Sequence, residues 1–241
     1  MRYFNFHAHL GKTTLGDANT VDDLVSDMKA LGIEKAGICN LTLATMKAKN
    51  DLIYDAKQKY PDFIRAYAYL NFKDPTVIDE IDLRMKQGFD GFKIINQWEG
   101  IRSDHYPPME NAFLYLRKFN KVIQIGTGST STPYPFIEYA RQYPEMQICF
   151  THIGQRELGN SIIAAVKDVP NITVETSQNY DRFILRKAVD VLSSKRVLMG
   201  TDWPYKPQYT ETHKMEDLGF SDEQLEDINY RNAARIWGDA I

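Results

Sequence analysis

Short apolar runs alternate with amphipathic stretches along the whole chain. Eight apolar runs have the length and composition of buried β-strands: 2–7, 35–40, 63–70, 91–95, 122–126, 147–152, 172–176 and 196–202. Between them lie stretches with the period of an α-helix, among them 20–32, 74–88, 134–143, 160–169, 181–194 and 221–238. This regular alternation indicates βαβ units that build a parallel sheet.

The helix boundaries carry their own signals. In 20–32 one helix face collects the apolar side chains of Val21, Leu24, Val25, Met28 and Leu31. Gly32 then stands where a helix commonly ends in a left-handed residue. Ser221 opens the last helix as a predicted N-cap, with Gln224 in the capping-box position.

Eight such units without a linker or a change in composition predict a single domain, residues 1–241, folded as a closed (β/α)₈ TIM barrel of the α/β class. An open doubly wound sheet is the alternative, and it usually carries a glycine-rich turn after its first strand. Here that turn reads HAHLGKTTLG, which lacks the G-x-G-x-x-G pattern. The longest irregular stretches, 96–108 and 202–214, both follow predicted strands, where barrel enzymes place active-site loops.

Composition narrows the functional classes. The 241 residues are 43% hydrophobic and 25% charged, and 29 basic against 32 acidic side chains give a net charge of -3, so we expect neither a nucleic-acid nor a membrane partner. Cys39 and Cys149 lie in apolar runs, which favours buried, reduced thiols over a disulfide. With no signal-peptide pattern and no membrane-length apolar run, we expect a cytoplasmic protein.

Ligand-type side chains stand where several predicted strands end. They are His7 and His9 on the first strand, Lys93 on the fourth, His152 on the sixth, Glu175 on the seventh and Asp202 on the eighth. Closure of a barrel brings these ends around one mouth, and residues i and i+2 of a strand point to the same face. Imidazoles and a carboxylate suit zinc and other first-row divalent ions.

Each of these residues also has a plain structural interpretation. The His7/His9 pair can simply occupy a strand, His152 can be a hydrogen-bonded core histidine, and Asp202 can form a turn before Trp203. Their common position on different strands of one barrel favours a shared site instead.

Several blocks of the chain resemble the amidohydrolase superfamily: FNFHAHLG, GFKI, CFTHIGQ, RVLMGTDWP and NYRNAARIWG. They are similar in particular to the amidohydrolase-related branch that contains aminocarboxymuconate semialdehyde decarboxylase. The resemblance implies a distorted TIM barrel with one divalent metal ion, often zinc, with manganese and iron as alternatives. By position it implies that His7, His9 and Asp202 bind the metal, that Asp202 also moves protons, and that His152 orients or protonates the substrate.

One position departs from the family pattern. A family block like IHTG carries a histidine after the fifth strand, whereas this chain reads QIGTG, with Gly126 at the ligand position. Three alternatives follow: His7, His9 and Asp202 still bind the ion, with His152 or water completing its shell; the ion is absent and these residues act directly on substrate, as in metal-independent lactonases; or the barrel is not catalytic.

The resemblance implies a metal-dependent hydrolase that attacks a small amide, ester or lactone with a metal-activated water. Asp202 would then take the water's proton and His152 would stabilise the oxyanion. The alternatives are decarboxylation of an unsaturated carboxylic acid at the same site, or a metal-independent lactonase. The branch also often forms homodimers.

Other side chains are candidates for substrate binding. Lys93 could contact a substrate carboxylate or form an internal ion pair, with carboxylation as a further alternative. Aromatic and imidazole rings of the predicted mouth loops could line the pocket or only pack in their loops: Trp98, His105, Tyr134, Trp203 and Tyr205. Glu175 is expected to be structural, and Arg65 either contacts an anionic substrate or forms an ion pair.

Overall fold

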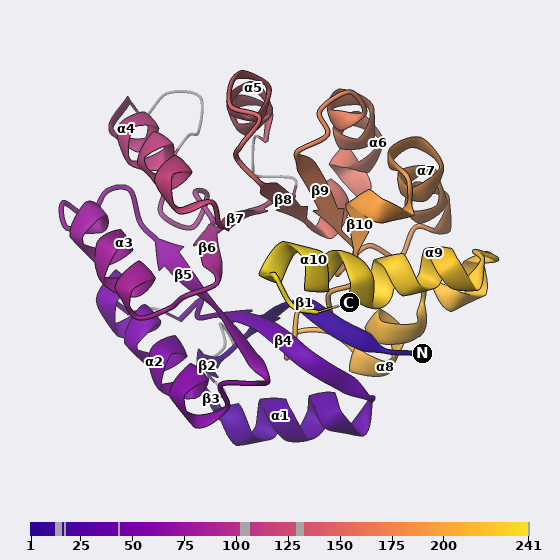
Figure 1. Ribbon diagram of the computed structural model, residues 1–241, viewed down its shortest axis with the longest axis horizontal. Helices are drawn as coiled ribbons and strands as arrows, with labels where there is room; N and C mark the ends of the chain where they lie inside the picture. Colours follow the sequence, from indigo (N-terminus) through magenta and orange to yellow (C-terminus); the bar gives the residue numbers. More distant parts are fainter. Residues whose placement is uncertain (13–15, 17, 43, 102–106, 129–132, 241) are drawn as a thin grey trace.

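A computed structural model describes the chain apart from residues 13–15, 17, 43, 102–106, 129–132 and 241 (Figure 1). Its centre is an eight-stranded parallel sheet in the order β1-β4-β5-β6-β7-β8-β9-β10. The strands are β1 (Tyr3–His9), β4 (Ile33–Cys39), β5 (Ile64–Leu70), β6 (Gly91–Ile94), β7 (Val122–Gly126), β8 (Ile148–Thr151), β9 (Ile172–Glu175) and β10 (Val197–Leu198). Each overlaps one predicted run: β1 extends beyond its run to His9, β4 begins before its run at Ile33, and β10 covers only the start of 196–202.

Backbone contacts between the first strand and the segment after the last strand close the sheet. The amide of Phe6 donates to the carbonyl of Met199 at 2.9 Å, and the amide of His9 donates to that of Trp203 at 2.8 Å. A parallel bridge also joins Ala8 to Trp203. The structure therefore confirms the predicted (β/α)₈ barrel.

Helices surround the strands, as Figure 1 shows for α1 to α7. They are α1 (Val21–Ala30), α2 (Met46–Lys59), α3 (Val77–Lys86), α4 (Pro107–Tyr115), α5 (Tyr134–Gln142), α6 (Gln155–Val166), α7 (Arg182–Leu192), α8 (Gln208–His213), α9 (Asp222–Glu226) and α10 (Asn232–Trp237). A π-helical turn, Asp227–Arg231, joins α9 to α10. A small antiparallel pair, β2 (Gly11–Lys12) and β3 (Ala18–Asn19), follows β1.

The predicted helix boundaries are confirmed at both ends of the chain. Gly32 has a φ of +72°, as expected beyond the end of α1. Ser221 and Gln224 form the predicted capping box, with each side chain accepting from the backbone amide of the other.

Helix α2 was not predicted, because its buried face is only partly apolar. Lys49 and Asn50 lie on that face beside Ile53. Asn50 uses its amide group on the backbone of Tyr69, accepting from its N–H at 2.7 Å and donating to its carbonyl at 3.1 Å. Tertiary hydrogen bonds thus fix a helix whose hydrophobic period is weak.

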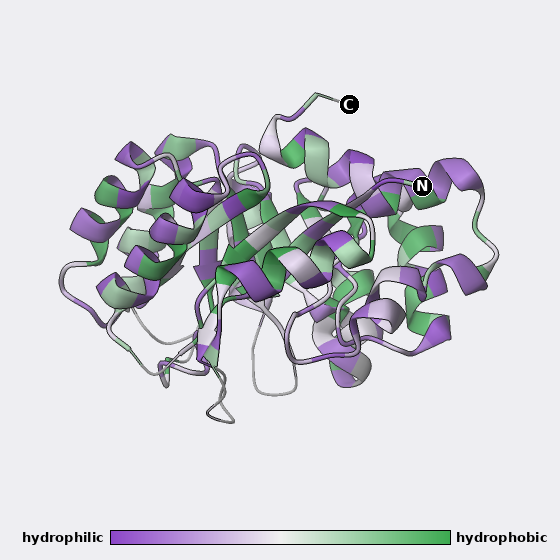
Figure 2. Ribbon diagram, turned by 90° about the horizontal axis from the view of Figure 1, so that it is seen from below, coloured by the Kyte–Doolittle hydropathy of each residue, from purple (hydrophilic) through white to green (hydrophobic). Residues whose placement is uncertain are grey.

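The end of the barrel that lies opposite the carboxyl ends of the strands is filled by aromatic side chains. Trp237 of α10 stacks on Phe6, with ring centroids 5.3 Å apart, and its indole N–H donates to the hydroxyl of Tyr67 at 2.7 Å. Figure 2 shows both termini and the end of α10 on this side of the molecule. The C-terminal helix therefore closes the end of the barrel that lies opposite the carboxyl ends of the strands. The carboxyl ends are left to form a site.

The described residues contain no helix long and apolar enough to cross a membrane. Cys39 and Cys149 are both buried and unpaired, as predicted. The cytoplasmic location and the homodimer stay predictions.

Thr20 caps the N-terminus of α1, and a substitution there tests this role. Its hydroxyl accepts from the amide of Asp23 at 3.2 Å, and the Asp23 carboxylate accepts from the Thr20 amide at 3.0 Å. We expect Thr20→Ala to lower the free energy of unfolding by about 1 kcal/mol, because it leaves the start of α1 uncapped. Urea denaturation measures the change. Thr20→Ser, which keeps the hydroxyl, should stay close to wild type, and equal losses in both variants would contradict the capping role.

Candidate active site

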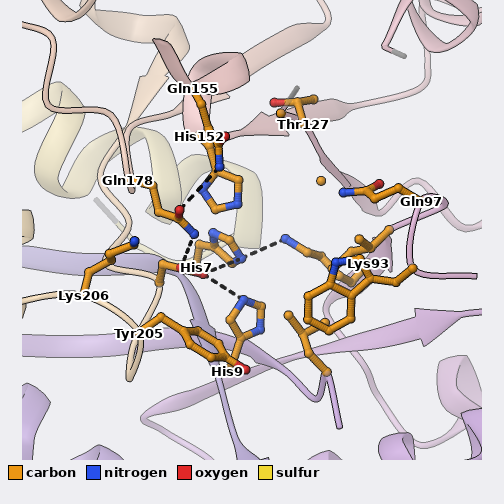
Figure 3. Close-up of a pocket in the computed structure, with 16 residues that line it drawn as sticks. His7, His9, Lys93, Gln97, Thr127, His152, Gln155, Gln178, Tyr205 and Lys206 are labelled. Atoms are coloured by element: carbon orange, nitrogen blue, oxygen red, sulfur yellow. Dashed lines mark hydrogen bonds and ion pairs between the residues drawn. The ribbon is translucent and has the colours of Figure 1, made fainter. Parts of the chain in front are cut away.

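A pocket of about 410 Å³ opens at the carboxyl ends of the barrel strands. Figure 3 shows the polar side chains converging on it from several elements. Its lining consists of His7, His9, Leu41, Lys93, Ile95, Gln97, Trp98, Gly126, Thr127, Gly128, His152, Gln155, Gln178, Asp202, Tyr205 and Lys206. Five of the six residues predicted from the strand ends thus share one cavity: His7, His9, Lys93, His152 and Asp202.

A bulge in β1 aims both histidines of that strand into the pocket. Between Asn5 and Ala8 strand β1 advances three residues, whereas its partner β4 advances only from Ala36 to Ile38. One extra residue reverses the alternation of faces, so the interior aromatics below are followed by interior histidines above. The rings of His7 and His9 meet edge to face, 4.7 Å apart.

His7 is held from both of its nitrogens. Nδ1 lies 3.0 Å from Oε2 of Glu175, and Nε2 lies 2.8 Å from Nζ of Lys93. A carboxylate can only accept, so Nδ1 carries the proton and Nε2 offers its lone pair to the pocket. Burial, reinforced by the charge of Lys93, holds the pKa of His7 well below its usual value, which keeps the ring neutral.

Glu175 and Ser177 bind two of the pocket histidines together. The Ser177 hydroxyl donates to Oε2 of Glu175 at 2.9 Å, and its oxygen lies 2.9 Å from Nδ1 of His152. His152 therefore also carries its proton on Nδ1 and presents Nε2 as an acceptor. Gly200 makes room for this arrangement, because a Cβ there would lie 2.2 Å from Oε1 of Glu175. Glu175 thus has a structural role, as expected: it holds two histidines of the site in position.

Asp202 and His9 form a buried pair. His9 Nε2 lies 2.9 Å from Oδ1 of Asp202, and the amide of Gln178 donates to the other carboxylate oxygen. On its far side, His9 Nδ1 lies 3.2 Å from the sulfur of Cys39.

In this pair the His9 imidazole is protonated and the Asp202 carboxylate is ionised. Burial opposes the charge of His9, but Cys39 and Asp202 outweigh burial and raise its pKa to about 9. Burial alone would raise the pKa of Asp202, but the hydrogen bond and the charge of His9 hold that pKa below its usual range. His152 differs, because burial lowers its pKa and keeps it neutral. The pocket therefore holds an imidazolium beside a carboxylate, with two neutral imidazoles next to them.

Several pocket residues have left-handed backbone angles that side chains rarely adopt. The φ is +67° at His152, +55° at Gln155, +59° at Gln178 and +53° at Asp202. Each such residue costs about 1–3 kcal/mol, and such strain concentrates at functional sites.

Three side chains are arranged as metal ligands. His7, His152 and Asp202 each offer an atom, and these atoms lie within 4.8 Å of one another. Neutral imidazoles that present Nε2 as an acceptor and an ionised carboxylate are the donor types that a first-row divalent ion requires. His9, predicted as a ligand together with His7 and Asp202, is next to this group and contacts Asp202, and its role as a ligand stays a prediction.

Gly126, at the position where the family pattern has a histidine, lies next to Ile95. A Cβ at Gly126 would lie 3.2 Å from Cγ1 of Ile95, which is closer than ordinary packing. Ile95 therefore crowds the first side-chain atom of any residue that replaced Gly126.

The predicted substrate-binding residues divide into three groups. Lys93, Trp98 and Tyr205 line the pocket. Trp203 does not, because its ring is buried in the hydrophobic core and its indole N–H donates to Asp27 at 2.9 Å. His105 lies outside the described residues.

The other candidates lie elsewhere. Tyr134 is 46% exposed and is not part of the pocket lining. Arg65 pairs with Asp239 at 2.5 Å, which is the ion pair expected for it.

The sequence reasoning did not single out several residues in the pocket or next to it. Ser177 and Gln178 follow Glu175 directly after β9, and Lys206 lies in the loop after β10, so their positions beyond strand ends were a usable signal. Gln124 lies on a strand below the pocket, where it contacts Lys93 at 3.3 Å, and no sequence pattern marks it.

Comparisons with known proteins agree with this architecture. The family model described as Amidohydrolase matches residues 17–238. Among solved structures, 2,6-dihydroxybenzoate decarboxylase from Rhizobium has a TM-score of 0.81 at 16% identity, with 99% of both chains covered. A dihydroxybenzoic acid decarboxylase from Polaromonas sp. JS666, with bound manganese and the inhibitor 2-nitroresorcinol, has a TM-score of 0.77 at 16% identity and covers 98% of this chain and 96% of its own.

A hydrolase shares the fold equally well. The probable 2-pyrone-4,6-dicarboxylic acid hydrolase from Acinetobacter baumannii, solved with citric acid, has a TM-score of 0.77 at 14% identity, with 99% of this chain and 100% of that chain covered. No curated protein matches the chain. At such identities the structural likeness establishes the fold, and the family model, which spans most of the sequence, establishes the family. The chain belongs to the amidohydrolase family of enzymes.

Proposed function

We propose that this enzyme decarboxylates a small unsaturated or aromatic carboxylic acid. The observation that carries the proposal is the His9/Asp202 pair, in which Nε2 of His9 lies 2.9 Å from Oδ1 of the buried Asp202 carboxylate, in a pocket that two lysines also line. Decarboxylation needs a bound carboxylate, a proton delivered to carbon and little free water. The pocket supplies groups for the first two, and the burial of Asp202 limits water.

Lys93 and Lys206 provide the positive charges for substrate binding. Lys93 projects from β6 and is fully buried, whereas Lys206 approaches from the loop after β10 on the opposite side of His7 (Figure 3). An ammonium group donates up to three hydrogen bonds, so Lys93 can hold His7 and a carboxylate oxygen at once. A pocket of about 410 Å³ suits a single-ring acid.

The proton follows a short path. The His9 imidazolium passes its Nε2 proton to Asp202, and Asp202 delivers it to the carbon that bears the carboxylate. The bond from that carbon to the carboxyl group then breaks, its electron pair returns to the unsaturated system, and carbon dioxide leaves. His9 regains a proton from solvent, which completes the cycle. Proton transfer from a positioned side chain contributes about 10²–10⁴-fold to such a rate.

The residues present also fit a divalent ion. His7, His152 and Asp202 would hold it, with Glu175 and Ser177 orienting the two imidazoles. When bound, the ion would supply positive charge to the substrate's oxygen atoms. Zinc is the first expectation from the donor set, and manganese is supported by its presence in the Polaromonas decarboxylase.

Hydrolysis of a small ester, amide or lactone is the second candidate. Asp202 is ionised and His152 presents a neutral Nε2, so either group could accept a proton from attacking water. The similarity in fold to the Acinetobacter hydrolase supports this candidate. The similarity in fold to two decarboxylases favours the first.

Substrate panels separate the two reactions. Purified enzyme, with and without added Mn²⁺ or Zn²⁺, is incubated with hydroxybenzoic and unsaturated carboxylic acids in one set and with small lactones, esters and amides in another. The proposal predicts carbon dioxide release from at least one acid. Turnover confined to the lactones, esters or amides would replace it with hydrolysis.

Lys206 should affect binding more than chemistry. We expect Lys206→Met to raise KM for an acidic substrate about tenfold while changing kcat little, because its ammonium group binds the substrate in ground and transition states alike. Lys206→Arg should restore much of the affinity. Steady-state kinetics measure both, and an unchanged KM in Lys206→Met would remove Lys206 from the binding site.

A further inference from the structure

Lys93 contacts the nitrogen through which His7 would bind a metal ion. Its Nζ lies 2.8 Å from Nε2 of His7 and 3.3 Å from Oε1 of Gln124 (Figure 3). The Lys93 side chain is fully buried, and in the described part of the chain it forms no ion pair. The shorter of these two contacts is thus with an uncharged imidazole, which is an unusual partner for a buried lysine.

His7 has only one lone pair to give. Its Nδ1 carries a proton that is donated to Glu175, so the acceptor is Nε2 alone. A hydrogen bond from Lys93 and a bond to a metal ion both require that lone pair in the same direction. The two states exclude each other at His7.

The rest of the site does not strongly favour the ion. Gly126 contributes no side-chain ligand, and Ile95 would crowd a Cβ at that position. Lys93, by contrast, lines the same pocket as Asp202; burial lowers the pKa of Lys93, while the acidic groups around it, Glu175 and Asp202 among them, favour its charged form. The lysine thus offers part of the charge compensation that a divalent ion would provide.

We propose that Lys93 is a built-in competitor for the metal position: its ammonium group occupies His7, and a divalent ion binds only when the Lys93 side chain turns away. This inference rests on the proposed active site but not on the reaction assigned to it. It makes the chain a weak metal binder whose affinity is set by a residue that is not itself a ligand.

Metal titration of two matched variants tests the competition. Lys93→Met and Lys206→Met each remove one positive charge from the same pocket, but only Lys93 touches His7. Affinity for Mn²⁺ and for Zn²⁺ is measured by isothermal titration calorimetry on metal-stripped protein. We expect Lys93→Met to bind at least about tenfold more tightly than wild type, and Lys206→Met to differ by less than about threefold.

Two further variants locate the ion and check folding. His7→Gln in the Lys93→Met background should abolish the gain, because the ion then lacks its His7 ligand. Lys93→Gln, which keeps a polar side chain, should reproduce the gain if Lys93→Met folds poorly, as judged by thermal unfolding without metal. Equal gains in Lys93→Met and Lys206→Met would indicate a general charge effect and overturn the inference. So would unchanged, weaker or undetectable metal binding in both Lys93 variants. None of these readouts depends on turnover, so the proposed reaction can fail without affecting the result.

Discussion

Asp202→Asn is expected to lower kcat by about 10²–10⁴-fold, since an amide cannot carry the proton from His9 to the substrate. The fold should survive, because asparagine tolerates the left-handed φ of +53° at this position. Its amide can also still contact Gln178 and His9. Steady-state kinetics measure the loss, and circular dichroism verifies the fold.

A matched control separates this effect from a general loss of charge. Asp190→Asn removes an exposed carboxylate on α7, outside the pocket, and should leave the rate unchanged. An Asp202→Asn enzyme that keeps more than about half of the wild-type kcat would exclude Asp202 as the proton donor.

Glu175→Gln is expected to lower kcat by about 10–100-fold through His7 and His152, which Glu175 orients from outside the pocket. Glu175 is fully buried and accepts from His7, from Ser177 and, at 3.4 Å, from the backbone amide of His152. The side-chain amide of glutamine would place N–H donors opposite the groups that now donate to Glu175. We therefore expect His7 to move its proton from Nδ1 to Nε2.

The tautomer of His7 distinguishes positioning from mere stability. Nitrogen-15 NMR of labelled imidazoles should show Nδ1–H in wild type and a changed pattern in Glu175→Gln. Ser177→Ala serves as the milder comparison, because it removes one hydroxyl but leaves the carboxylate on His7. A wild-type His7 tautomer together with a reduced rate would show that Glu175 acts in some other way.

The sequence was informative where chemistry coincides with strand ends. Alternating apolar and amphipathic runs predicted the barrel. Because a closed barrel gathers the carboxyl ends of its strands around one mouth, His7, His152 and Asp202 were expected to meet there although they are far apart in the sequence. The pairing of the two β1 histidines was also predicted. The bulge that turns them inward leaves no trace in the alternation of residue types.

Contacts made across the barrel could not be predicted in the same way. Trp203 directly follows Asp202, yet its ring points into the core toward Asp27, because neighbours after a strand need not share a direction. The contact between Lys93 and His7 depends on side chains from β6 and β1, and only the closed barrel brings them together. Helix α2 is held by hydrogen bonds of Asn50 to β5, which periodicity does not register.

The most direct test of the proposed reaction follows the two products of one turnover. An acid that passes the substrate panel is prepared with carbon-13 in its carboxyl group and incubated with the enzyme in D₂O. The account predicts labelled carbon dioxide and bicarbonate, and one deuterium on the carbon that lost the carboxyl group, both lost in Asp202→Asn. Labelled carboxylate retained in a hydrolysed product, with no deuterium on that carbon, would contradict it.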